Sequence, residues 1–271
     1  MPVTIVERML EVENLAKRYG DVLALTDLTV NVGERSCLVL LGRNGAGKTT
    51  ALRCMAGVLA PTAGTVRVDG IDAAAEPAAV RARVGLMPEL PGLYERMSAR
   101  AYLDYFGAIY EMSADLRRRR INELLDLFEL SDAGDRWLGT FSKGMRQKVA
   151  LIRATLHRPR LVLADEPTSA LDPDSARRAW AYLRDLQAHG CALVICTHNM
   201  EEAEHLSASD VGDATIGIMS AGRALAIGDM SSLRVRSGLP VRREVRELPT
   251  LQDIYLAIVG NHHELAESRS A

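Results

Sequence analysis

The sequence predicts an α/β protein with a parallel β-sheet, an antiparallel β edge and an inserted helical subdomain. Three observations support this fold class. Short apolar runs alternate with helical segments along the chain, which is typical of a parallel sheet covered on both faces. A glycine-rich loop follows one apolar run and precedes a helix. A helical stretch from about residue 91 to 158 interrupts the alternation, and we expect it to form its own lobe.

The N-terminal part of the chain predicts the β edge. Leu28, Val30 and Val32 alternate with polar residues, and Val66 and Val68 repeat the same spacing. A period of two residues is the pattern of a strand that buries one face. We therefore expect strands in both segments, before the helical lobe begins.

The helical lobe is predicted from apolar residues that recur every three or four positions between Ala99 and about Leu130. This spacing places side chains on one face of a helix. The two expected faces consist of Tyr102, Tyr105, Phe106 and Ile109, and of Ile121, Leu124, Leu125 and Phe128. A further helix is expected to follow the segment SKGMRQ.

The second half of the chain returns to the alternating pattern. The apolar segments LVLA and ALVIC predict buried strands, with a helix over residues 173–189 between them. Gly238 and Pro240 then mark a boundary. We therefore expect a main domain over residues 1–235, which contains the inserted lobe, and a short helical tail over residues 236–271.

Composition and charge exclude several classes of protein. The net charge of −2 provides no electrostatic basis for a nucleic-acid partner, and the run Arg117–Arg120 is interpreted as a solvated helix face because acidic residues follow it. None of the apolar runs approaches the ~20 residues needed to cross a bilayer, so any membrane part would belong to another chain. The four cysteines form no C-x-x-C pair, and we expect reduced, mostly buried thiols.

The glycine-rich loop GRNGAGKTT fits the pattern G-x-x-x-x-G-K-[ST], with a strand before it and a helix after it. Glycines let the backbone aim its N–H groups at phosphate oxygens, and the helix N-terminus favours an anion. The phosphates are expected to contact Gly42, Arg43, Asn44, Gly45, Ala46, Gly47, Lys48, Thr49 and Thr50. Lys48 would reach the β- and γ-phosphates, and Thr49 would bind Mg²⁺. The alternative is a glycine turn without a ligand, which the flanking elements disfavour.

The segment LVLADEP places two carboxylates at the end of an apolar strand. Asp165 is expected to hold Mg²⁺ through water. Glu166 would accept a proton from the attacking water, or orient that water. Adjacent acids on a loop are usually only solvated, but their place at a strand end, after a phosphate loop, favours the functional interpretation.

These two motifs indicate a P-loop ATPase or GTPase without distinguishing the two. The segment FSKGMRQK, at residues 141–148, resembles the signature of the ATP-binding cassette (ABC) family, commonly Leu-Ser-Gly-Gly-Gln. Ser142 and Gly144 match it, whereas Lys143 and Met145 depart from it. The resemblance implies a RecA-like P-loop NTPase core, ATP and Mg²⁺, and a head-to-tail pair in which Ser142 and Gly144 touch the ATP bound to the other cassette. A helix-capping role for Ser142 is compatible with this.

Further positions resemble the family in the same order along the chain. Tyr19 matches the aromatic residue that stacks on adenine, although an aromatic in a strand more often belongs to a core. The segment Ser169–Asp172 matches the loop at the dimer interface, so Asp172 joins the expected ATP contacts. His198 matches the histidine that contacts the γ-phosphate. Glu89 stands where the family usually has glutamine and can still reach Mg²⁺ or water. The resemblance implies that Glu166, His198, Lys48 and Glu89 form the catalytic set.

The segments MPE, SKGMRQK and LPTLQDIYLAIVG together resemble the cassettes of bacterial type-2 exporters of drugs, antibiotics, sodium or polysaccharides. In the tail, Thr250 can cap a helix whose apolar face would consist of Leu251, Ile254, Tyr255 and Ile258. The resemblance implies an ATPase subunit that drives a separate permease from the inner face of the cell membrane. An importer subunit, a soluble ABC ATPase and a degenerate regulatory cassette remain alternatives. Glu89 argues mildly for export, and the intact catalytic set argues against degeneracy.

Overall fold

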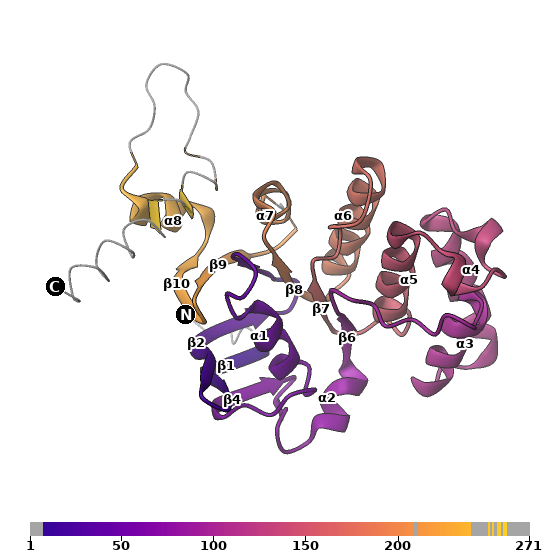
Figure 1. Cartoon of the computed structure of the whole chain (residues 1–271), viewed down its shortest axis with the longest axis horizontal. Coiled ribbons are helices and arrows are strands. Elements are labelled where there is room, and N and C mark those ends of the chain that lie inside the picture. The colour runs from indigo at the N-terminus through magenta and orange to yellow at the C-terminus, as the bar shows by residue number, and fades with distance from the viewer. Residues whose placement is uncertain are drawn as a thin grey trace, which may run out of the picture.

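The computed structural model describes residues 8–208, 211–239, 249, 251, 254, 255, 257 and 258 (Figure 1). The strands are β1 (Arg8–Tyr19), β2 (Val22–Gly33), β3 (Cys37–Leu41), β4 (Ala63–Val68), β5 (Ile71–Asp72), β6 (Val84–Met87), β7 (Leu161–Asp165), β8 (Ala192–Thr197), β9 (Ala214–Ser220) and β10 (Arg223–Gly228). The helices are α1 (Lys48–Met55), α2 (Pro77–Arg83), α3 (Ala99–Ile109), α4 (Ala114–Leu127), α5 (Lys143–Thr155), α6 (Pro173–Ala188), α7 (Met200–Ser207) and α8 (Met230–Ser237), with short 3₁₀ turns η1 (Ser131–Ala133) and η2 (Leu138–Thr140).

The strands form two sheets, as the sequence predicted. The larger has the order β10-β9-β3-β8-β7-β6, and its neighbours pair in parallel except for β10, which is antiparallel to β9. The smaller sheet, β2-β1-β4-β5, is antiparallel throughout. The predicted α/β fold with a parallel sheet and an antiparallel edge is therefore confirmed.

The central strands are apolar on both faces because both faces are covered. In β3, Cys37, Val39 and Leu41 face a core shared with the helices of the lobe and with α6 and α7. Leu38 and Leu40 face a second core, shared with α1 and the antiparallel sheet. A side-chain period of two on a doubly covered strand produces such an unbroken apolar run. The four cysteines are buried and free, as predicted.

The helices α3, α4 and α5 lie together at one end of the molecule, away from the antiparallel sheet (Figure 1). The predicted face of α4 is buried as expected. The predicted face of α3 is only half correct, because Tyr102 is buried and Phe106 partly buried, whereas Tyr105 and Ile109 are exposed. The stripe that α3 buries is rotated toward Leu103 and Gly107, where the small glycine allows close approach of the Arg117 and Leu156 side chains. The contacts with Arg117 and Leu156 therefore determine which face of α3 is buried.

Helix boundaries follow capping residues. The helix expected after SKGMRQ begins inside that segment, since the Ser142 hydroxyl accepts a hydrogen bond from the backbone N–H of Met145 at 3.2 Å and caps α5. The predicted helix over 173–189 corresponds to α6. A left-handed Gly238, with φ 65°, ends α8. Pro240 and Thr250 lie outside the described residues. Among the described helices, none combines the length and apolarity that a membrane span requires.

The described part of the tail packs back on the main domain. Leu251, Ile254 and Tyr255 are helical and buried in the same core as the lobe helices, and Ile258 packs against that core. The backbone N–H of Leu251 donates a hydrogen bond to the Glu204 carboxylate on α7. Three residues of the predicted apolar face of the tail are thus buried against the main domain, and the fourth, Ile258, is partly buried there.

Candidate active site

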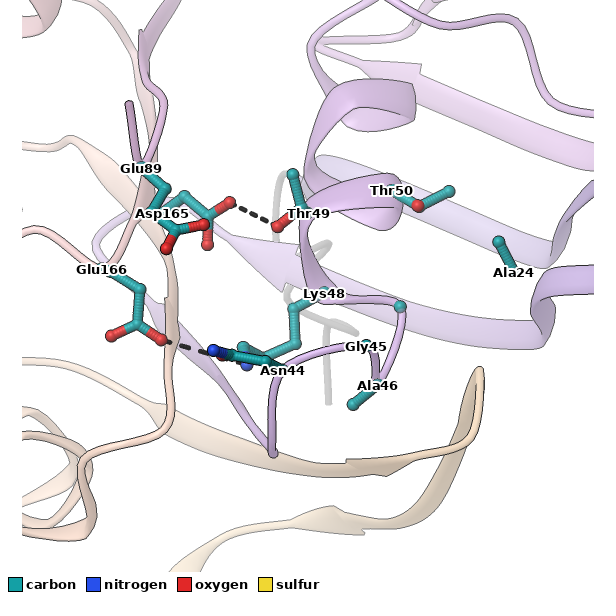
Figure 2. Close-up of a pocket in the computed structure, with 11 residues that line it drawn as sticks. Ala24, Asn44, Gly45, Ala46, Lys48, Thr49, Thr50, Glu89, Asp165 and Glu166 are labelled. Atoms are coloured by element: carbon teal, nitrogen blue, oxygen red, sulfur yellow. Dashed lines mark hydrogen bonds and ion pairs between the residues drawn. The ribbon is translucent and has the colours of Figure 1, made fainter. Parts of the chain in front are cut away.

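A pocket lies where the glycine-rich loop meets the carboxyl ends of the parallel strands (Figure 2). Its lining residues are Ala24, Asn44, Gly45, Ala46, Gly47, Lys48, Thr49, Thr50, Glu89, Asp165 and Glu166. They come from β2, the loop after β3, the start of α1, the segment after β6, the end of β7 and the residue that follows it. Open α/β sheets bind ligands at this edge, because strand ends and helix N-termini converge there. The structure therefore unites the two motifs that the sequence singled out.

The loop before α1 needs glycine at two positions for different reasons. A Cβ at Gly42 would lie 2.4 Å from the backbone oxygen of Met219 on β9, so the loop passes too close to that strand for a side chain. Gly47 has φ 95°, a left-handed conformation, and forms the N-cap of α1. The result is a tight turn that points the first backbone N–H groups of α1 into the pocket.

Lys48 is the cation of the pocket and is buried. Its ammonium group donates hydrogen bonds to the backbone oxygens of Gly42 and Arg43, the latter at 3.3 Å. It also lies 4.0 Å from the Glu166 carboxylate. A lysine ammonium has three donors on a flexible stem, so it can exchange carbonyl partners for phosphate oxygens.

Hard oxygen donors gather opposite Lys48. The Thr49 hydroxyl donates to the Asp165 carboxylate at 2.6 Å. Glu89 lies beside Asp165 on the other side of the pocket (Figure 2). Burial raises the pKa of Asp165, the Thr49 hydrogen bond lowers it, and the negative charges of Glu166 and Glu89 raise it further. A bound cation would relieve this concentration of negative charge.

Glu166 holds an uncommon backbone conformation. Its φ is 53°, in the left-handed region that costs a non-glycine residue roughly 1–2 kcal/mol. Its N–H donates to the Cys196 oxygen at 2.8 Å, and its own oxygen accepts from the Gln147 side-chain amide at 2.8 Å and from Ser169. These contacts hold the strained residue in place. Such strain, held by surrounding structure, is typical of functional sites.

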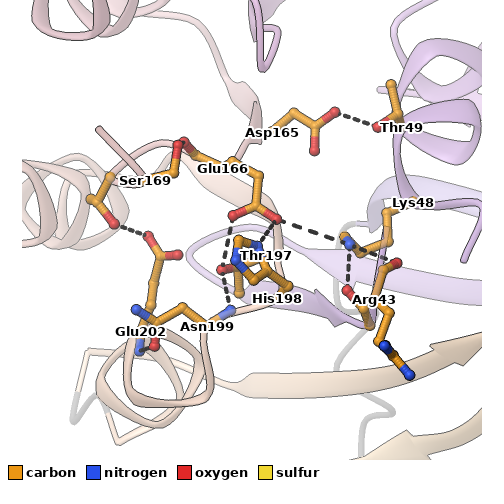
Figure 3. Close-up of polar contacts among 12 residues, drawn as sticks. Arg43, Lys48, Thr49, Asp165, Glu166, Ser169, Thr197, His198, Asn199 and Glu202 are labelled. Atoms are coloured by element: carbon orange, nitrogen blue, oxygen red, sulfur yellow. Dashed lines mark hydrogen bonds and ion pairs between the residues drawn. The ribbon is translucent and has the colours of Figure 1, made fainter. Parts of the chain in front are cut away.

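The Glu166 side chain is anchored at both oxygens (Figure 3). One oxygen lies 2.7 Å from Nδ1 of His198, and the other accepts from the Thr197 hydroxyl at 3.5 Å. The His198 side chain is 55% exposed, whereas that of Glu166 is 6% exposed. The loop after β8 therefore fixes the carboxylate and leaves the imidazole open to a ligand.

The remaining predicted site residues lie outside this pocket. Tyr19, at the end of β1, is 45% exposed, with the Lys17 ammonium 5.5 Å from its ring centroid. Ser142 and Gly144 stand at the N-terminus of α5. A Cβ on Gly144 would lie 2.9 Å from the Ala170 oxygen, so this glycine also permits contact with the loop before α6.

Asp172 has a clear structural role. It caps α6 by accepting hydrogen bonds from the backbone N–H groups of Asp174 and Ser175, at 3.1 and 2.9 Å. Hydrogen bonds from the backbone N–H and the side chain of Ser175 lower the pKa of Asp172 to about 2. Arg43 lines a neighbouring cavity with His198, on the other side of the loop.

Sequence reasoning missed Gln147, Thr168, Thr197 and Glu202, which support the Glu166 segment. Gln147 bonds its backbone, and Thr197 bonds its carboxylate. Glu202 accepts a hydrogen bond from Thr168, two residues after Glu166. The sequence could have pointed to them, because each lies inside or next to a motif that was already singled out.

Comparison with known proteins identifies the family. The family described as ABC transporter matches residues 25–169, slightly more than half of the chain. The chain belongs to the ABC transporter family. The matched range contains the glycine-rich loop, the signature segment and both strand-end carboxylates.

Relatives along nearly the whole chain agree with this. The daunorubicin resistance ATP-binding protein DrrA2 of Streptomyces coeruleorubidus is 34% identical, over 95% of this chain and 80% of its own. The ABC transporter ATP-binding protein NatA of Bacillus subtilis (strain 168) is 37% identical, over 83% of this chain and 91% of its own. This chain is thus an ABC ATP-binding subunit.

Solved structures of ABC cassettes have the same fold. An ATP-binding subunit of an ABC transporter superposes with a TM-score of 0.82 at 29% identity, covering 93% of this chain and 99% of its own. A dimeric cassette in a post-hydrolysis state, bound to ADP and phosphate, superposes with a TM-score of 0.74 at 25% identity, covering 82% and 99%. The ABC cassette described here binds ATP and hydrolyses it.

Proposed function

We propose that two cassettes of this chain close head-to-tail around two ATP molecules and drive a separate export permease. The observation that carries the proposal is that the pocket of a single chain does not include the signature residues. Lys48 and Thr49 share it with the strand-end carboxylates, whereas Ser142 and Gly144 lie outside it, at a helix N-terminus. A second copy would bring those donors to the open side of the phosphates. The dimeric cassette bound to ADP and phosphate supports this arrangement.

The carboxylate and imidazole on neighbouring strand ends would carry the hydrolysis step. Glu166 takes a proton from a water molecule while the water oxygen attacks the γ-phosphorus, and the bond to the bridging oxygen of ADP breaks. His198, at 2.7 Å from that carboxylate, is exposed enough to contact the γ-phosphate as well. Lys48 would neutralise charge on the β- and γ-phosphates, since its ammonium already points into the pocket.

Magnesium fits the donors in the pocket. Mg²⁺ prefers hydroxyl, carboxylate, water and phosphate oxygens. The Thr49 hydroxyl lies 2.6 Å from an oxygen of the Asp165 carboxylate. The negative charge of Glu89 is close enough to raise the pKa of Asp165. We propose that these three residues hold the ion, which would offset phosphate charge. Within the described residues, no group of three or more His, Cys, Asp and Glu side chains could hold a metal ion by itself.

The names of the relatives support export. One relative is named as a daunorubicin resistance ATP-binding protein, and another as a Nod factor export ATP-binding protein. We propose that the permease docks between the lobes, around residues 89–100, where Leu90, Tyr94 and Arg96 are exposed. The cassette would then work at the inner face of the cell membrane. Its ATP-binding unit would span residues 1–235, with the lobe at 91–158 inserted and residues 236–271 as a tail.

Mixing two inactive variants tests the shared site. Lys48→Ala removes the phosphate-loop cation, and Ser142→Asp places a negative charge where the partner's γ-phosphate would lie. Asp caps helices as well as Ser does, so α5 keeps its cap in the second variant. Each variant alone should lose ATP turnover. In a mixed head-to-tail pair, one composite site takes both defects and the other takes none, so part of the wild-type phosphate release should return.

Ser142→Asn is the matched control, because Asn also caps the helix but carries no charge. It should retain far more activity than Ser142→Asp. The proposal is contradicted if the mixture stays inactive although native mass spectrometry proves that heterodimers form.

A further inference from the structure

A buried carboxyl group lies outside the pocket, on α7. Glu202, in the first turn of α7, is 1% exposed. In the part of the chain that the structure describes, no basic side chain forms an ion pair with it. It instead accepts hydrogen bonds at one oxygen from the Thr168 hydroxyl, at 2.7 Å, and from the Trp180 indole N–H, at 3.2 Å. Burying a carboxyl group is costly unless its hydrogen bonds are satisfied, so this arrangement calls for a reason.

Helix capping does not supply that reason. A glutamate at the third position of a helix often reaches back to the backbone N–H of the capping residue. Here Asn199 caps α7 with its own side chain, and its backbone N–H donates to the Thr197 hydroxyl at 3.0 Å. The Glu202 side chain points instead toward the loop after β7, on which Figure 3 labels Ser169. There it accepts the hydrogen bond from Thr168.

Both threonines adjoin the reaction residues. Thr168 follows Glu166 by two residues, and Thr197 directly precedes His198. The Thr197 hydroxyl donates to the Glu166 carboxylate at 3.5 Å and also lies close enough to Glu202 to lower the pKa of that carboxyl group. A hydroxyl has a single proton, so it can donate to only one of the two carboxyl groups.

The Thr197 hydroxyl is thus positioned between the carboxyl groups of Glu166 and Glu202. Burial raises the pKa of Glu202, hydrogen bonds from Thr197, Thr168 and Trp180 oppose that shift, and the charge of Glu166 adds to it.

We infer that Glu202 is a positioning residue for the Glu166 carboxylate, acting through the hydroxyls of Thr197 and Thr168. This inference rests on the proposed role of Glu166 in hydrolysis. Glu202 links the loop after β7, which holds Glu166, to the end of β8, which is followed by His198. This link fixes the position of Glu166 relative to His198. Misplacing a catalytic group by 1 Å can cost about 100-fold in rate.

Steady-state ATP hydrolysis by the full chain tests this, with ATP affinity measured separately by a fluorescent nucleotide. Glu202→Ala should lower kcat about tenfold or more and leave the ATP Kd unchanged. Glu202→Gln should restore most of the rate, because its amide oxygen accepts from Thr168 and its amide nitrogen donates to Thr197. Thr197→Val keeps the shape without the hydroxyl and should lower kcat similarly. The losses of Thr197→Val and Glu202→Ala should not add when combined.

Leu206→Ala is the matched control, since it removes a buried side chain from the same helix without touching the network. The inference is overturned if Glu202→Ala loses no more kcat than Leu206→Ala, or if Glu202→Gln fails to recover. Loss of turnover in Glu166→Gln with normal turnover in Glu202→Ala overturns this inference alone. Normal turnover in Glu166→Gln removes the proposed role of Glu166 and this inference with it.

Discussion

Several segments of the cassette fix both the backbone and the side chain of Glu166. Its left-handed backbone is held by bonds from three other segments, and both its carboxylate oxygens have partners. The strain costs roughly 1–2 kcal/mol and is repaid by contacts from α5, from β8 and from the loop before α6. A carboxylate held in this way needs little reorganisation when a water molecule and a phosphate arrive beside it.

Lys48→Ala should separate phosphate binding from adenine binding. Hydrogen bonds to charged groups contribute about 1.5–3 kcal/mol each, so losing the ammonium should weaken ATP binding roughly 10- to 150-fold. The exposed Tyr19 ring would contribute by stacking alone, at about 1 kcal/mol. Tyr19→Ala should therefore weaken binding less than Lys48→Ala, and Tyr19→Phe should bind like the wild type. Calorimetric titration with ATP measures all three, and equal losses in Tyr19→Ala and Tyr19→Phe would contradict stacking.

At this scale, fixed spacing made the motifs predictable. The pattern from Gly42 to Thr49 is local, so sequence alone places its chemistry at one helix N-terminus. Gln147 and Glu202 were missed because their roles depend on partners far away in the chain, at Glu166 and Thr168. A buried polar side chain takes its role from its partners, and a place inside or beside a motif does not by itself identify those partners.

Elements were predicted best where both faces are buried. The apolar runs of β3, β7 and β8 leave little alternative to a central parallel sheet, whereas α3 exposes part of its apolar surface. Tyr105 and Ile109 satisfy the helical spacing, yet they lie beside the contact that α3 makes with its neighbours. Periodicity therefore identifies a helix more reliably than the position of its buried face.

A half-buried histidine between two elements predicts a pH dependence of stability. His157, just after α5, stacks on Tyr110, just after α3, with ring centroids 3.6 Å apart. Burial of its ring nitrogens lowers the pKa of His157 to about 4. In the unfolded chain His157 has the ordinary histidine pKa of 6.5. Between pH 6.5 and pH 4 the unfolded chain therefore binds a proton at His157 that the native state does not bind. Stability should therefore fall as the pH drops from 6.5 toward 4.

His157→Phe should remove this penalty while keeping a ring beside Tyr110. The loss of unfolding free energy between pH 7.5 and pH 5 should shrink by about 2 kcal/mol, measured by urea denaturation at both values. His189→Gln is the control, because His189 lies exposed at the end of α6 and should leave the wild-type pH profile intact. An unchanged pH profile in His157→Phe would contradict the assignment.

At the scale of the whole molecule, the nucleotide pocket and the signature segment lie on different parts of the chain. The parallel sheet and the loop before α1 form the pocket, and the helical lobe carries Ser142 outside it, at the start of α5. Because the pocket of a single chain includes no residue from α5, its phosphates would remain open to water on one side. Closure of two copies would cover that side and align a water molecule between Glu166 and the γ-phosphate.

ATP-dependent pairing of Glu166→Gln tests this account most directly. Glutamine keeps the shape of the side chain but cannot accept the proton, so ATP should bind and persist. Analytical ultracentrifugation with Mg²⁺ should show a monomer without nucleotide and a dimer with ATP, holding two ATP molecules per dimer and releasing no phosphate. A variant that binds ATP and stays monomeric, or that releases phosphate at the wild-type rate, would contradict the account.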